Sequence, residues 1–149
     1  MNPDAPAAST GRSDSRALVE EFYRALAAGA PEAVRQLIED NFTEDASLAR
    51  PESLPSGGIL AGRDRIKRLM MAVATAEGGP LDARQMRVTR VLESVGDDRD
   101  EIGVELTFPW RGTPTTSFEW WVLQQRKVVE IRAFYWDTAM MLGHGPQDG

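Results

Sequence analysis

The chain has 149 residues, 42% of them apolar, and a formal net charge of −6 at pH 7. This length and composition fit one globular domain with its own core, and the acidic balance argues against a nucleic-acid partner. Cysteine is absent and histidine occurs once, so we expect no disulfide, no metal site and no Ser–His–Asp triad. We also expect no organic cofactor, because no glycine-rich phosphate loop follows a predicted strand.

The sequence predicts no targeting or membrane segment. No stretch approaches the roughly 20 apolar residues of a membrane span, and residues 1–14 lack the apolar core of a secretory signal. We therefore expect a cytoplasmic protein without a membrane partner. Residues 1–14 and 143–149 are predicted to be a flexible arm and a flexible tail, and residues 15–142 a single domain.

Three helices are predicted in the first half of the chain. Ser15 is a suitable N-cap for a helix whose apolar residues recur every four positions before Gly29. Pro31 suits the first turn of a second helix. After a segment over 45–60 that starts like a strand and is broken by prolines, Asp64 opens a third.

After residue 80 the apolar period changes from that of a helix to that of a strand. Four segments separated by short turns alternate in this way: 84–95, 102–108, 115–123 and 128–136. Helices followed by an antiparallel meander predict an α+β domain with the helices on one face of a curved sheet.

Two stretches carry a family resemblance: EEFYRALAAGAPEAVRQLIED followed by DASLARP, and KVVEIRAFYWDTA near the end of the chain. With this order of elements, residues 16–142 resemble the nuclear-transport-factor-two-like superfamily, and within it ketosteroid isomerase and the SnoaL-like polyketide cyclases. The resemblance implies a cone-shaped, curved antiparallel sheet with the N-terminal helices packed over its concave face. It also implies a deep apolar pocket and a homodimer formed through the outer face of the sheet.

The resemblance also assigns roles by position. Ketosteroid isomerase uses an Asp base, with a Tyr and a protonated Asp that form an oxyanion hole. Glu119 falls at the position of the protonated Asp, so it would be a neutral acid that donates a hydrogen bond. The base position, before the proline in ASLARP, is Arg50, and the tyrosine position is Phe22, with Tyr23 one step round the helix. The family's own base is therefore absent.

The surroundings of Glu119 depend on the turn that follows its strand. If the turn has two residues, 125–126, Glu119 lies opposite Arg132 and the two charges pair. If it has three, 124–126, Glu119 lies opposite Ile131, and Arg132 points to the other face. No Gly or Asn fixes the turn type, so the residues leave both registers open, and the resemblance favours the second.

Alternation along 115–123 gives this strand two aromatic faces. The face expected to line the pocket carries Ser117, Glu119 and Trp121. The face expected to form the homodimer interface carries Phe118, Trp120 and Val122. A monomer would expose this second face as an apolar patch.

The predicted site combines hydrogen-bond donors with an apolar wall. The candidate catalytic residues are Glu119, Tyr135 and Tyr23. The candidate substrate-binding residues are Phe22, Arg50, Glu52, Trp121, Ile131 and Asp137. Other roles remain open for three of these: Arg50 also fits a surface cation or a loop clamp, Asp137 a helix cap, and Glu52 a base at the rim of the pocket.

Together with the resemblance, these residues predict a cofactor-independent cyclase or isomerase that acts on a hydrophobic, polyketide-like substrate. Aromatic walls would fold the substrate into a reactive conformer, and Glu119, Tyr135 or Tyr23 would donate to a carbonyl on which charge develops. The alternative is a non-catalytic module that binds a small molecule in the same pocket.

Overall fold

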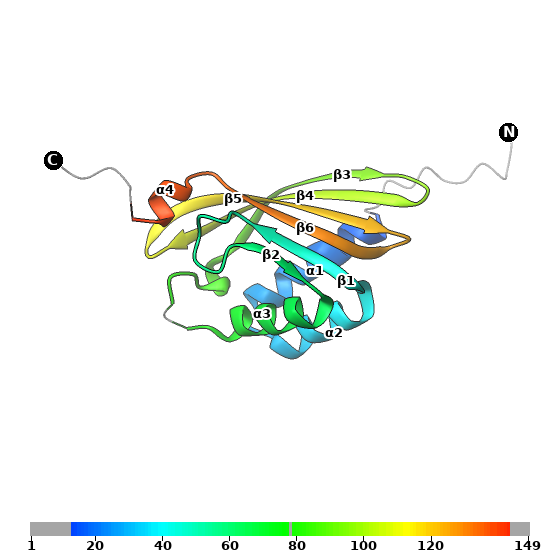
Figure 1. Cartoon of the computed structure of the whole chain (residues 1–149), viewed down its shortest axis with the longest axis horizontal. Helices are drawn as coiled ribbons and strands as arrows, with labels where there is room; N and C mark the ends of the chain where they lie inside the picture. Colours follow the sequence, from blue (N-terminus) through cyan, green and yellow to red (C-terminus); the bar gives the residue numbers. More distant parts are fainter. Residues whose placement is uncertain (1–12, 78, 144–149) are drawn as a thin grey trace, which may run out of the picture.

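The structure is a computed structural model that describes residues 13–77 and 79–143. Most of the predicted arm and tail, including the single histidine, lies outside the described residues. Figure 1 shows the elements, which in chain order are α1 (Asp14–Ala27), α2 (Pro31–Asn41), β1 (Phe42–Arg50), β2 (Gly58–Ala61), α3 (Arg63–Thr75), the 3₁₀ helix η1 (Ala83–Gln85), β3 (Arg87–Val95), β4 (Arg99–Trp110), β5 (Thr113–Gln124), β6 (Lys127–Tyr135) and α4 (Thr138–Met141).

The strands form one sheet in the order β2-β1-β6-β5-β4-β3. Neighbouring strands are antiparallel except β1 and β6, which run parallel. The predicted α+β fold with a curved sheet is confirmed, but the sheet is mixed rather than wholly antiparallel. The physical reason is that β1 and β6 are joined through β2, α3 and the β3–β5 strands instead of a hairpin, and a long connection allows two strands to run in the same direction.

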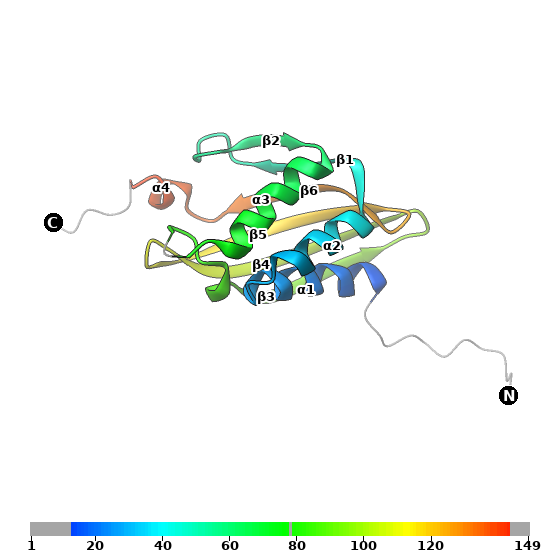
Figure 2. The same ribbon diagram turned by 90° about the horizontal axis from the view of Figure 1, so that it is seen from below.

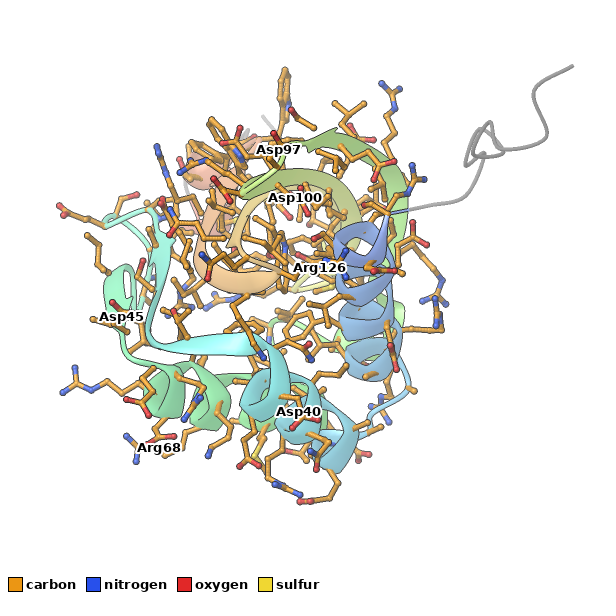
Figure 3. The ribbon with its side chains drawn as sticks, turned by 90° about the vertical axis from the view of Figure 1, so that its right-hand side faces the viewer. Asp40, Asp45, Arg68, Asp97, Asp100 and Arg126 are labelled. Carbon is orange, nitrogen blue, oxygen red and sulfur yellow. The ribbon has the colours of Figure 1, made fainter. Side chains whose placement is uncertain are left out.

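The three long helices cover one face of the sheet (Figures 1 and 2). Seen from one end in Figure 3, the sheet curves around the side chains that lie between it and the helices. Fully buried residues of both layers form the core, among them Val19, Phe22 and Ile66 of the helices and Leu106 and Trp121 of the sheet. Burying each such side chain contributes roughly 1.5–3 kcal/mol, so contact between the two layers holds the helices in place.

The start of α1 differs slightly from the prediction. Ser13, rather than Ser15, is the N-cap, and its side chain accepts a hydrogen bond from the backbone N–H of Arg16. Ser15 is buried within the first turn, where its hydroxyl donates to Asp100 of β4 at 2.5 Å. The second serine therefore ties α1 to the sheet instead of capping it.

The hairpin between β5 and β6 has a two-residue turn, Gln125–Arg126, with positive φ angles of 48° and 63°. Beyond the turn the pairing shifts at Val129, which has no partner on β5 and forms a β-bulge. The bulge moves the register of all later pairs in this hairpin by one residue.

This shift makes both predicted registers of Glu119 wrong. Glu119 pairs with Ala133 rather than with Arg132 or Ile131. The turn length alone would have placed Arg132 opposite Glu119, but the extra residue on β6 moves the pairing on by one. Arg132 instead lies opposite Trp120 on the outer face, with its guanidinium 5.7 Å from the centre of the Trp120 ring. Glu119 is therefore not neutralised by an arginine on the neighbouring strand.

The outer face of the sheet exposes an aromatic patch made of Phe118, Trp120 and Phe134, which are between 36% and 45% exposed. Arg132 lies over two of these rings, at 5.7 Å from Trp120 and 5.6 Å from Phe134. Val122, which was predicted to belong to this patch, is buried. The outer aromatic patch therefore contains Phe134 of β6 in place of Val122.

Candidate functional site

An enclosed cavity of about 70 Å³ lies between the helices and the concave face of the sheet. Most of its wall is apolar, with Leu26, Leu48, Leu69, Met70, Val73 and Phe108 among the lining residues. The polar side chains in the wall are Tyr23 of α1, Arg50 of β1, Ser117 and Glu119 of β5, and Tyr135 of β6. Residues far apart in the chain thus bring a few polar groups into one apolar enclosure.

A short chain of hydrogen bonds holds Glu119. Tyr23 Oη donates to Glu119 Oε2, and Trp121 Nε1 donates to Tyr23 Oη at 2.8 Å. The rings of Tyr23 and Trp121 are buried and pack edge to face against Phe22, at centroid distances of 5.5 Å and 5.0 Å. Because this packing fixes both rings, the tyrosine hydroxyl is held against the carboxyl group.

Burial is the main cause of the unusual proton affinity of this pair. Loss of water raises the pKa of Glu119 above its ordinary value, although the hydrogen bond from Tyr23 and the charge of Arg50 both act to lower it. Burial, and then the charge of Glu119, raise the pKa of Tyr23 well above its ordinary value. The carboxyl group therefore keeps its proton to a higher pH than an exposed glutamate, and Tyr23 stays a neutral phenol.

Tyr135 faces the same cavity from β6, opposite Ser117 of β5. Burial, and then the charge of Glu119, raise the pKa of Tyr135 to about 12, while Arg50 acts in the opposite direction. The hydroxyl of Tyr135 is therefore protonated at neutral pH and can donate a hydrogen bond.

Two buried polar atoms of the cavity wall have no hydrogen-bond partner among the described residues: Ser117 Oγ and Arg50 Nε. Ser117 is only 2% exposed, and leaving such a group unpaired costs about 1–3 kcal/mol. Both donors are closed off from water, so pairing either with a ligand atom in the cavity requires neighbouring side chains to move. Alternation along the strand predicts Ser117 on the pocket face, but no local pattern indicates that its hydroxyl is left unpaired.

The structure gathers some of the predicted site residues and separates others. Those that line the cavity are Phe22, Tyr23, Arg50, Glu119 and Tyr135. Trp121 and Ile131 are buried in the core behind this wall.

Two of the predicted residues lie away from the cavity. Glu52 is exposed in the turn after β1. Asp137 caps α4, where its side chain accepts a hydrogen bond from the backbone N–H of Met140 at 2.9 Å. A capping role, which the sequence left open for Asp137, accounts for this residue.

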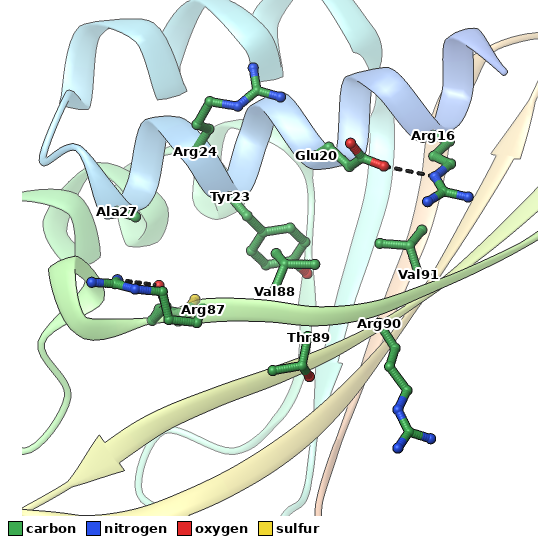
Figure 4. A pocket seen from close by; sticks show the side chains of 11 residues that line it. Arg16, Glu20, Tyr23, Arg24, Ala27, Arg87, Val88, Thr89, Arg90 and Val91 are labelled. Carbon is green, nitrogen blue, oxygen red and sulfur yellow. Dashed lines mark hydrogen bonds and ion pairs between the residues drawn. The ribbon is translucent and has the colours of Figure 1, made fainter. Parts of the chain in front are cut away.

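A groove of about 440 Å³ between α1 and β3 adjoins the cavity (Figure 4). It shares Tyr23 and Met86 with the cavity wall. Figure 4 shows the Tyr23 ring extending from α1 toward Val88 of β3, with Glu20 joined to Arg16 nearer the start of the helix. Tyr23 therefore stands between the cavity and one route to solvent.

No family model and no curated protein match the chain, but many solved structures do. An NTF2-like protein of unknown function from Cytophaga hutchinsonii is 14% identical, with a TM-score of 0.63 over 89% of this chain and 98% of that chain. Bal32a, from a soil-derived mobile gene cassette, is 21% identical, with a TM-score of 0.61 over 83% and 89% of the two chains. TerC, co-crystallised with polyporic acid, is 19% identical, with a TM-score of 0.62 over 88% and 97%.

The chain has the NTF2-like fold. The resemblance to the nuclear-transport-factor-two-like superfamily is thereby confirmed at the level of fold. Since these identities are below 25%, the NTF2-like likeness shows the fold and does not indicate a reaction. Any activity has to be inferred from the residues of the site.

A membrane span and a metal site each require particular features of the described residues. None of the helices in residues 13–77 and 79–143 is both long and apolar enough to cross a membrane. Within the same ranges, no group of three His, Cys, Asp or Glu side chains is arranged to hold a metal ion.

The raised pKa of Glu119 predicts how stability depends on pH. Since the ordinary value is 4.5, this group stabilises the folded state fully below about pH 4.5, and the contribution is lost as pH rises through the higher folded-state pKa. Glu119→Gln cannot titrate. We expect the free energy of unfolding of the wild type, relative to that of E119Q, to fall in urea titrations as the pH rises above about 4.5.

Glu44→Gln is the matched control, because the Glu44 side chain is 91% exposed. This change should leave the pH dependence of stability as it is in the wild type. A difference between the wild type and E119Q that is constant or grows with pH would mean that the pKa of Glu119 is not raised by folding.

Proposed function

We propose that this protein is a cofactor-independent cyclase or isomerase that acts on a hydrophobic, polyketide-like substrate by folding it and polarising a carbonyl group. The observation that carries the proposal is Glu119, an acid with a raised pKa that is bonded by Tyr23 and faces an enclosed apolar cavity. A neutral carboxylic acid in this position donates a hydrogen bond to a carbonyl oxygen, and that bond strengthens as the oxygen gains charge.

The hydrogen-bond chain gives Glu119 and Tyr23 different roles in this proposal. Tyr23 donates a hydrogen bond to Glu119 Oε2 and accepts one from Trp121. Its hydroxyl proton is therefore used to support the acid and is not available to the substrate. With Oε2 accepting, a proton on Glu119 Oε1 is the one available to the substrate. Successive bonds in such a chain polarise one another, and the Tyr135 hydroxyl is a further donor in the cavity.

The cavity supplies an acid but no carboxylate base. Glu119 is the only carboxylate among the described residues that line it, and Arg50 occupies the position of the base in ketosteroid isomerase. We therefore favour a ring closure that needs little proton transfer. Folding of the substrate would supply most of the acceleration, since holding reacting groups together can remove about 7–11 kcal/mol of a barrier.

The cavity is smaller than the proposed substrate. Its volume of about 70 Å³ lies below the roughly 300–1,000 Å³ of pockets for small molecules. Met70 and Met86 line the cavity, and methionine side chains repack with little strain. We propose that these side chains move aside when the substrate binds.

The alternative function is a non-catalytic module that binds a small molecule in the same cavity. The missing base favours this alternative. TerC, which has the same fold at 19% identity, was co-crystallised with polyporic acid. The two functions differ in whether Glu119 changes the rate of a reaction or only the affinity for a ligand.

A small ketone tests the polarising role directly. Cyclopentanone, labelled with ¹³C at its carbonyl and bound to the protein, should show a lower infrared C=O stretching frequency than it does in water. Glu119→Gln keeps a donor and should retain part of this change, whereas Glu119→Ala should abolish it. With a substrate that is turned over, E119A should lose about 100–1,000-fold in rate, and E119Q less.

Glu44→Ala is the control for this experiment and should behave as the wild type. If E119A leaves the bound carbonyl frequency unchanged, Glu119 is not the donor. If E119A weakens binding but no substrate is turned over by the wild type, the binding module is the better account.

We also propose that the outer aromatic patch is the interface of a homodimer. Phe118, Trp120 and Phe134 lie on adjacent strands, and pairing of two such faces would remove their rings from water. Trp120→Glu would bury a charge in the interface and should shift the protein toward monomer in light scattering at micromolar concentration.

Ile59→Glu is the control, because Ile59 is 76% exposed on β2, at the far edge of the sheet. This variant should keep the oligomeric state of the wild type. A wild-type protein that is monomeric at micromolar concentration would contradict the proposed interface.

A further inference from the structure

A second hollow adjoins the cavity where the end of β1 faces α3. It has a volume of about 410 Å³ and shares Arg50 and Leu69 with the cavity wall. Its other charged lining residues are Arg65 and Arg68 of α3, and no described carboxylate lines it. We call this hollow the arginine depression.

The arginines of this depression have no acidic partner in the part of the chain that the structure describes. In the groove between α1 and β3, by contrast, Arg16 pairs with Glu20 at 2.7 Å. Within the described residues, no carboxylate forms an ion pair with Arg50, Arg65 or Arg68. On a chain with a net charge of −6, the depression is therefore a local site of positive potential, which attracts anions.

Arg50 is the fixed member of the three. Its Nη2 donates to the carbonyl oxygen of Ser56, while its Nε is buried without a partner in the described structure. The loop that supplies this carbonyl turns closely at Gly57, where a Cβ atom would lie 2.0 Å from the Pro51 carbonyl oxygen. The loop thus holds the guanidinium in place and leaves one buried donor without an acceptor.

Arg65 and Arg68 are the adjustable members. They are exposed, and a separation of three residues puts them on one side of α3. Figure 3 shows Arg68 extending from α3 into solvent. Long side chains of this kind can turn onto an anion that Arg50 has already positioned.

We infer that the arginine depression binds the oxyanion end of an amphipathic ligand, a carboxylate or a phosphate, whose apolar end enters the cavity beside Glu119. The inference rests on the proposed function, because it takes the cavity as the place of the apolar end. Arginine binds both oxyanions through parallel N–H donors. A ligand that extends past Arg50 and Leu69 would occupy two adjoining volumes, which together suit a larger molecule than the cavity alone.

Binding in the depression would also act on the acid in the cavity. The charge of Arg50 lowers the pKa of Glu119, and an oxyanion on Arg50 would offset that charge. The ligand would thereby favour the protonated form of Glu119, the form that donates to a carbonyl.

Amphiphiles of one chain length test the site. Octanoate, octyl phosphate, octanol and inorganic phosphate would be titrated by calorimetry into the wild type, the double variant R65Q/R68Q and the control Arg126→Gln. Arg126 is 78% exposed at the β5–β6 turn and is labelled in Figure 3. It lies just before the start of β6, whereas Arg50 lies near the other end of β6, next to the pair formed by Ala49 and Arg132. R126Q therefore removes one of the same charges far from the depression.

We expect the wild type and R126Q to bind octanoate or octyl phosphate at least about tenfold more tightly than octanol. R65Q/R68Q should lose this preference, and the preference should weaken with added salt. The anionic amphiphile that binds more tightly identifies the oxyanion. Inorganic phosphate, which lacks the apolar chain, should bind more weakly than either amphiphile.

Three results would overturn the oxyanion site: equal affinity for octanol and both anions, no measurable binding of either anion, or unchanged affinity in R65Q/R68Q. The proposed function is judged separately, by the carbonyl frequency of cyclopentanone in E119A. If the ketone is polarised but anions are not preferred, the proposed function stands and the oxyanion site is wrong. If anions are preferred but the ketone is not polarised, the oxyanion site stands and the proposed function is wrong.

Discussion

A carboxyl group can lie among buried aromatic rings only if a proton or hydrogen bonds compensate for the water that it loses. At Glu119 the compensation comes from Tyr23, whose hydroxyl is itself bonded by Trp121. The rings that make this possible are core residues, so the packing that stabilises the domain also orients the acid. Tyr23 belongs to α1 and Glu119 to β5, and the bond between them therefore depends on the helix layer being docked on the sheet.

The pairing of β5 with β6 keeps Arg132 away from this site. The bulge at Val129 sets the register that pairs Glu119 with Ala133 and leaves Arg132 on the outer face among aromatic rings. Among the described residues, the arginine that acts on Glu119 from inside is Arg50, which lies where the cavity meets the arginine depression. The same residue thus couples a candidate binding site for an anion to the protonation of the acid.

Most of the fold follows from patterns that are local in sequence. Helical and strand periods, Pro31 and the alternation along β5 were sufficient to predict three helices, four of the strands and the inward face that carries Glu119. The β1–β6 pairing was not predicted, because it joins segments about 80 residues apart in a direction that no local pattern specifies. The bulge was missed because nothing in the β6 sequence marks Val129 as unpaired. The unpartnered state of Ser117 and Arg50 depends on what surrounds each side chain in three dimensions.

Glu119 can donate to a carbonyl only if it is a neutral acid at the pH at which the protein works. Infrared difference spectroscopy of the wild type minus E119Q, on protein with ¹³C-labelled glutamate, measures this protonation state directly. We expect a C=O band of a protonated carboxylic acid at neutral pH that is absent in E119Q and shifts with the label. A difference spectrum that contains only the bands of an ionised carboxylate at neutral pH would contradict this expectation.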